Sequence, residues 1–149
     1  MNKARLLPLP LPLVLCACAG GMITTYEPPR SGPIARLGVS GNFAGHTYVR
    51  HAGECQKRHV PADNLVTLIP AEKPIVIERV FNAGESGNLG FCSVAVRFVP
   101  ERGVDYDARM VLRENRCTLT LLAGPEGRAK PVAAVVQVPS ECEEPVAAE

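Results

Sequence analysis

The sequence predicts an all-β fold, a small antiparallel β-sandwich held by two disulfides. Short segments in which apolar and polar residues alternate recur from residue 34 onward, separated by glycine, proline and asparagine. No long segment shows the 3.6-residue period of an amphipathic helix. Four cysteines lie in the same region, and an even number of cysteines is typical of a disulfide-bonded domain. These four are Cys55, Cys92, Cys117 and Cys142.

The clearest strand is expected at residues 92–98. Alternate residues there are apolar or cysteine, so they share one face of a strand, and we expect that face to be buried. These residues are Cys92, Val94, Val96 and Phe98. Pro100 and Gly103 then break the pattern, which predicts a turn.

The next strand is expected at residues 104–113. Tyr106, Ala108, Met110 and Leu112 fall on one face, and Asp105, Asp107, Arg109 and Arg113 fall on the other. This pattern predicts a strand that is buried on one side and solvated on the other. After a turn at 114–116, Cys117, Leu119 and Leu121 resume the inward side. Weaker strands are expected at 46–50, 65–69, 74–81 and 132–138, with a glycine-rich loop at 82–88.

The positions of Cys92 and Cys117 favour a change of sheet between these two strands. In a flat meander of strands 92–99, 104–113 and 116–122, the two cysteines would lie about 10 Å apart. A disulfide needs Cα atoms within about 7 Å. A crossing at residues 100–103 would let them meet across the core of a sandwich. Cys55 and Cys142 would then form the second bond, but four cysteines allow three pairings.

Gly103 and Tyr106 at this crossing resemble a tyrosine corner, in which a phenol hydroxyl bonds the backbone at the turn between sheets. The alternative is that Tyr106 is simply an aromatic residue of the core.

The N-terminal residues have the order of a bacterial export signal. Lys3 and Arg5 precede an apolar run at residues 6–15, and small residues follow. The apolar run is shorter than the about 20 residues that a membrane-spanning helix needs. It also contains Pro8, Pro10 and Pro12, which disfavour a helix. We therefore expect export rather than a transmembrane span.

Residues 15–18, Leu-Cys-Ala-Cys, resemble the bacterial lipobox. Small Ala17 precedes Cys18, whereas bulky Leu15 precedes Cys16, so Cys18 matches better. The resemblance implies that a signal peptide at 1–17 is removed and that Cys18 becomes the lipidated first residue. Because Ala19 rather than aspartate follows, it also implies the outer membrane. The alternative is cleavage after Ala19, which would release a soluble periplasmic protein.

The mature chain is expected to divide into a tether and one domain. Residues 18–33 are rich in glycine and proline, which predicts a lipidated N-terminus and a flexible tether. Residues 34–149 have the length of a single β-sandwich domain.

The lipobox, the small size and the run Cys92…Phe98-x-Pro100-x₂-Gly103-x₂-Tyr106…Cys117 resemble small proteobacterial outer-membrane lipoproteins with an immunoglobulin- or prealbumin-like sandwich. The likeness covers roughly a third of the chain. It brings no catalytic residues and no cofactor. The expected function is therefore non-catalytic, a structural or protein-interaction role at the membrane, with an envelope protein as the expected partner.

Composition and motifs narrow the other function classes. A formal net charge of +1 with no cluster of Lys and Arg argues against nucleic-acid binding. Ser40 and Ser86 each lie between glycines but lack the final glycine of a nucleophile elbow, so turns are expected there. Asp105 and Asp107 beside Arg109 are typical of solvated charge pairing.

Three histidines, His46, His51 and His59, offer an alternative function as a periplasmic metal-binding module. Histidine is the commonest ligand for zinc and copper. On one extended strand His46 and His51 point to opposite faces, because their separation is odd. They would converge only through a bend at Gly53, with Glu54 as a further ligand. The simpler interpretation is three surface histidines near a loop.

Overall fold

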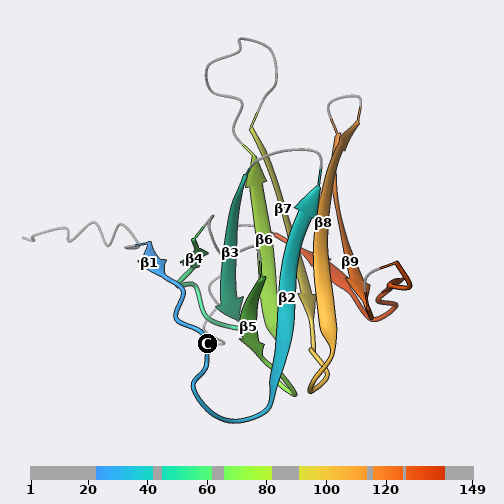
Figure 1. The fold of residues 1–149 in the computed structure, drawn as a ribbon. Coiled ribbons are helices and arrows are strands. Elements are labelled where there is room, and N and C mark those ends of the chain that lie inside the picture. The colour runs from blue at the N-terminus through green and yellow to red at the C-terminus, as the bar shows by residue number, and fades with distance from the viewer. Residues whose placement is uncertain are drawn as a thin grey trace, which may run out of the picture.

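The computed structural model describes residues 23–41, 45–61, 66–81, 91–113, 116–125 and 127–139. These residues form strands in two sheets and contain no helix, which confirms the predicted all-β fold (Figure 1). One sheet has the order β1-β4-β3-β6-β7-β11, and the other has the order β10-β9-β8-β2-β5. Among the described residues, none forms a helix long and apolar enough to cross a membrane.

The strands are short and follow one another closely. Their bounds are β1 (Thr24–Thr25), β2 (Ile34–Gly41), β3 (His46–His51), β4 (Arg58–Val60), β5 (Val66–Pro70), β6 (Ile75–Phe81), β7 (Cys92–Phe98), β8 (Asp105–Arg113), β9 (Arg116–Ala123), β10 (Lys130–Pro131) and β11 (Val136–Val138).

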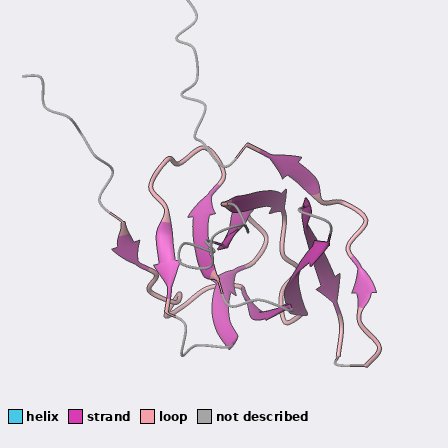
Figure 2. Cartoon of the chain, turned by 90° about the horizontal axis from the view of Figure 1, so that it is seen from above, coloured by secondary structure: helices cyan, strands magenta, loops and turns pink. Residues whose placement is uncertain are grey.

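The two sheets enclose one hydrophobic core. Viewed from above, the strands surround a common interior (Figure 2). Leu37, Ile69, Ile75 and Ile77 are fully buried there, and Phe98 packs edge-on against Tyr106 with ring centroids 5.1 Å apart. Burial of such side chains is the main favourable term in folding, at about 25 cal/mol per Å² of apolar surface.

Most pairs of neighbouring strands are antiparallel, as predicted, but two are parallel. β2 pairs with β8 from Arg36 opposite Asp105 to Gly41 opposite Met110, and β1 pairs with β4. Parallel neighbours need a long connection, and here most of the domain lies between β2 and β8. The antiparallel prediction is therefore wrong for these two pairs.

The strongest strand predictions are confirmed. β7 covers the predicted residues 92–98, and alternate residues of β8 are buried from Tyr106 to Met110. β3, β5 and β6 match the weaker predictions closely. The predicted strand at 132–138 is right only at its end, β11. Its first half crosses from β9 in one sheet to β7 in the other, where Val132 and Val135 pack against the core.

The predicted crossing between sheets is also confirmed. β7 and β8 belong to different sheets, and Cys92 and Cys117 form a disulfide with Cα atoms 6.3 Å apart. The Tyr106 hydroxyl accepts a hydrogen bond from the Glu101 N–H at 2.8 Å, and Tyr106 is only 6% exposed. Tyr106 is thus both a tyrosine corner and a core aromatic.

Two disulfides were predicted, and the described residues contain one. Cys142 and the predicted loop at 82–88 lie outside the described residues, as do the signal peptide and Cys18. The Cys55–Cys142 pairing therefore stays a prediction.

The described part of the predicted tether, residues 23–33, belongs to the sandwich. Thr24 and Thr25 form β1, and Tyr26 is only 8% exposed within the core. The Tyr26 hydroxyl donates to the carbonyl oxygen of Leu68 at 2.9 Å. Ile23 and Tyr26 are too few hydrophobic residues to form a period, so the sequence pattern placed the start of the domain too late.

Candidate functional site

The outer face of the six-stranded sheet carries two clusters of polar side chains. Along β3, Thr47 and Val49 point into the sandwich and are buried. Because successive side chains of a strand alternate between faces, His46, Tyr48 and Arg50 point outward. The first cluster surrounds Arg50 and Glu78, and the second contains His46, Tyr48 and His59.

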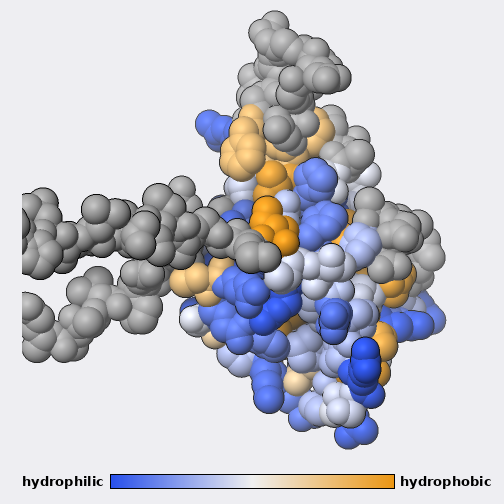
Figure 3. Space-filling model, turned by 90° about the vertical axis from the view of Figure 1, so that its left-hand side faces the viewer, coloured by the Kyte–Doolittle hydropathy of each residue, from blue (hydrophilic) through white to orange (hydrophobic). Residues whose placement is uncertain are grey.

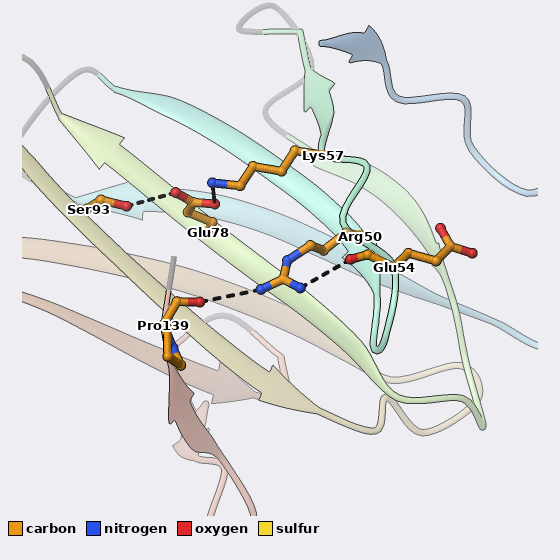
Figure 4. Close-up of polar contacts among 6 residues, drawn as sticks. All are labelled: Arg50, Glu54, Lys57, Glu78, Ser93 and Pro139. Atoms are coloured by element: carbon orange, nitrogen blue, oxygen red, sulfur yellow. Dashed lines mark hydrogen bonds and ion pairs between the residues drawn. The ribbon is translucent and has the colours of Figure 1, made fainter. Parts of the chain in front are cut away.

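The first cluster consists of two separate sets of polar contacts, one around Glu78 and one around Arg50 (Figure 4). Glu78 is 4% exposed; its carboxylate lies 2.7 Å from the Lys57 ammonium and accepts a hydrogen bond from the Ser93 hydroxyl at 2.8 Å. Arg50, which is 8% exposed, donates to the carbonyl oxygens of Glu54 at 3.1 Å and Pro139 at 3.4 Å. These contacts fasten the segment after β3 and the end of β11 to the sheet, which is a structural role.

The second cluster brings two of the three histidines together. His46 Nδ1 lies 3.2 Å from His59 Nε2, and the ring centroids are 5.3 Å apart. Tyr48 lies directly opposite His59 in the β3–β4 pairing, with ring centroids 5.4 Å apart. His46 is therefore the diagonal neighbour of His59 on the same face of the sheet.

His51 does not join this cluster. It lies at the other end of β3, opposite Ile75, and points to the other face. The chain does turn at Gly53, but the Glu54 carboxylate pairs with Arg58 at 3.0 Å. No group of three or more metal-ligating side chains occurs in the described residues. The predicted set of three histidines is thus reduced to His46 and His59.

The outer face of the other sheet carries paired charges, as the sequence predicted for Asp105 and Asp107. Asp107 accepts hydrogen bonds from Ser40 at 2.7 Å and from Arg109 at 3.1 Å. Asp105 accepts two bonds from Arg36, at 2.5 and 2.6 Å. These hydrogen bonds hold the pKa of the Asp105 carboxyl below its ordinary value. Such exposed pairs contribute little stability.

Arg36 is the member of this group that the sequence did not identify. It lies opposite Asp105 only because β2 and β8 pair in parallel, and no local pattern indicates that register. Together with Gly124, Pro125, Gly127 and Ala129, these side chains line a depression of about 540 Å³.

An apolar groove of about 390 Å³ lies at the end of the sandwich near the β7–β8 crossing. Phe98, Val104 and Val132 line it, together with Val99 and Val136, which are 55% and 50% exposed. The side of the molecule that carries β1 and β4 looks different: hydrophilic residues cover much of it, and hydrophobic residues gather toward its upper part (Figure 3).

One buried cation stands apart from these clusters. Arg79 points into the sandwich from β6 and is 3% exposed, and its Nε and Nη1 atoms have no hydrogen-bond partner among the described residues. Burial lowers the pKa of its guanidinium, and the charge of Asp107 partly opposes this effect. A buried cation without matched acceptors costs stability.

Comparison with known proteins returned no match to a family model, a curated protein or a solved structure.

Proposed function

We propose that this chain is an exported, lipid-anchored β-sandwich protein with a non-catalytic structural or protein-interaction role in the cell envelope. The Cys92–Cys117 disulfide is the observation that carries the proposal, because it joins the two sheets. Disulfides persist in oxidising compartments such as the bacterial periplasm. The lipobox resemblance implies lipid attachment at Cys18 and a location at the outer membrane.

The polar contacts are consistent with a structural role. Glu78, Asp105 and Asp107 each accept hydrogen bonds from, or pair with, side chains of another strand or loop. These contacts tie neighbouring segments together and need no substrate to explain them. A sandwich whose strands and loops are joined by many side-chain contacts is suited to present a fixed surface to another protein.

The anchor is tested by replacing each leader cysteine in turn. In Cys18→Ser the protein should move from the membrane fraction to the soluble periplasm, because acyl chains supply the membrane affinity. Cys16→Ser is the matched control and should stay with the membrane. A Cys18→Ser protein that remains membrane-bound would contradict lipid anchoring, and a soluble wild-type protein would point to cleavage after Ala19.

The interaction role is tested by crosslinking in intact envelopes. The anchored protein should be recovered with one identified envelope protein in near-equal amounts, and the Cys18→Ser protein should recover less of it. If crosslinkers of two lengths recover the chain only by itself, the interaction role is wrong, whatever the anchoring experiment shows.

A further inference from the structure

The pair formed by His46 and His59 is not explained by a structural or protein-interaction role. Two imidazoles from neighbouring strands lie on one face of the six-stranded sheet, with ring nitrogens 3.2 Å apart. His46 is exposed and His59 is half-buried, so both rings can be reached from solvent. Neither ring takes part in the buried network around Glu78.

The distance between the nitrogens suits a shared metal ion. Zinc and copper bind imidazole nitrogen at about 2.0–2.1 Å. Two such ligands at an angle between 90° and the tetrahedral angle therefore lie about 2.9–3.4 Å apart. The observed 3.2 Å falls within this interval.

We propose that His46 and His59 bind one divalent transition-metal ion on the outer face of this sheet. The two imidazoles supply two ligands, and water fills the remaining positions, so the site is open on its solvent side. Tyr48 packs beside both rings, with centroids 6.4 Å from His46 and 5.4 Å from His59, and restricts their orientation. Imidazole ligands favour Cu²⁺ over Zn²⁺ in the usual order of affinities.

The competing explanation for the same distance is a direct hydrogen bond between the imidazoles, with one ring as donor. Metal titration separates the two. The tag-free mature protein, with its disulfides oxidised, is titrated with Cu²⁺ and with Zn²⁺ by calorimetry, and the Cu²⁺ complex is examined by electron paramagnetic resonance. One ion per chain should bind, Cu²⁺ more tightly than Zn²⁺, with coupling to two equatorial nitrogens.

His51 provides the matched control, because it lies on the other face at the far end of the same strand. His46→Gln and His59→Gln should each weaken Cu²⁺ binding at least about tenfold and leave one coupled nitrogen. His51→Gln should change neither property. Thermal unfolding without metal checks that each variant is folded.

Three outcomes would overturn the proposal. The first is no binding at about 100 μM metal, which would leave a hydrogen-bonded pair. The second is binding that persists in both His46→Gln and His59→Gln. The third is an equal loss in His51→Gln, which would restore the set of three histidines predicted from sequence. None of these outcomes bears on the lipid anchor or on a protein partner.

Discussion

Tyr26 shows how a single side chain extends the core beyond the regular strands. Burial raises the pKa of its phenol to about 12, although the positive charge of Arg58 opposes the shift. The folded-state pKa therefore lies above the value of about 10 in the unfolded chain. The neutral phenol stabilises the fold fully below pH 10, and this contribution is lost as the pH rises from about 10 to about 12.

We predict that one of the three tyrosines titrates near pH 12 when absorbance at 295 nm is followed, and that Tyr26→Phe removes this step. The variant should also lose less stability between pH 10 and 12 than the wild type. A late titration step that persists in Tyr26→Phe would assign the raised pKa to another tyrosine.

Arg79 and Arg50 are both buried arginines, but their surroundings differ. Arg79→Met should raise the free energy of unfolding by about 1 kcal/mol, because it removes a desolvated cation and keeps a similar apolar stem. Arg50→Met should lower it by about 1–2 kcal/mol, because two carbonyl oxygens lose their donor. Urea unfolding at pH 7 measures both variants. Destabilisation of more than 1 kcal/mol in Arg79→Met would mean that its guanidinium is well paired in the native protein.

At the scale of strands, the alternation of apolar and polar residues predicted the features that depend on one segment alone. The period-two patterns of β7 and β8 were sufficient to place both strands and their buried faces. Pairings between distant segments were not predictable in this way. Arg36 meets Asp105 only through the register of β2 and β8, which are far apart in the sequence. His46 meets His59 only through the register of β3 and β4, which are consecutive but whose alignment no local pattern indicates. A candidate site built across strands therefore required the structure.

The parallel pairing of β2 and β8 depends on a close backbone approach at Gly41. A β-carbon added there would overlap the carbonyl oxygen of Met110, and the φ angle of +143° is one that other residues rarely adopt. Gly41→Ala should therefore cost about 2–3 kcal/mol, from steric overlap and backbone strain together.

Gly103 offers a control for the strain alone. Its φ angle is +74°, and a β-carbon there would meet nothing within 4 Å. Gly103→Ala should cost about 1 kcal/mol, measured by the same urea unfolding. If the two alanine variants lose equal stability, the close approach of β2 and β8 at Gly41 adds nothing to the cost of the substitution in free energy of unfolding.

For the whole molecule, two features join the sheets on the side where β7 and β11 of one sheet face β9 and β10 of the other. The segment from β10 to β11 crosses from one sheet to the other and seats Val132 and Val135 on the core. The Cys92–Cys117 bond joins the start of β7 to the start of β9.

Arg50 donates hydrogen bonds to both Glu54 and Pro139. Glu54 precedes Cys55 in the sequence, and Pro139 lies three residues before Cys142. This contact supports the predicted second pairing, which non-reducing peptide mapping would check.

The inter-sheet disulfide should contribute substantially to the stability of this fold. It closes a loop with a sequence separation of 25 residues and so restricts the unfolded chain. By loop-closure entropy, removing it in Cys92→Ser/Cys117→Ser should lower the free energy of unfolding by about 3 kcal/mol. The urea m-value should rise at the same time, because an unfolded chain without the crosslink exposes more surface.

If stability falls while the m-value stays constant, the loss comes from packing around the cysteines in the folded state rather than from the freed loop. If neither quantity changes although mapping shows the bond intact in the wild type, the crossing at residues 100–103 and the β10–β11 segment hold the two sheets together without it.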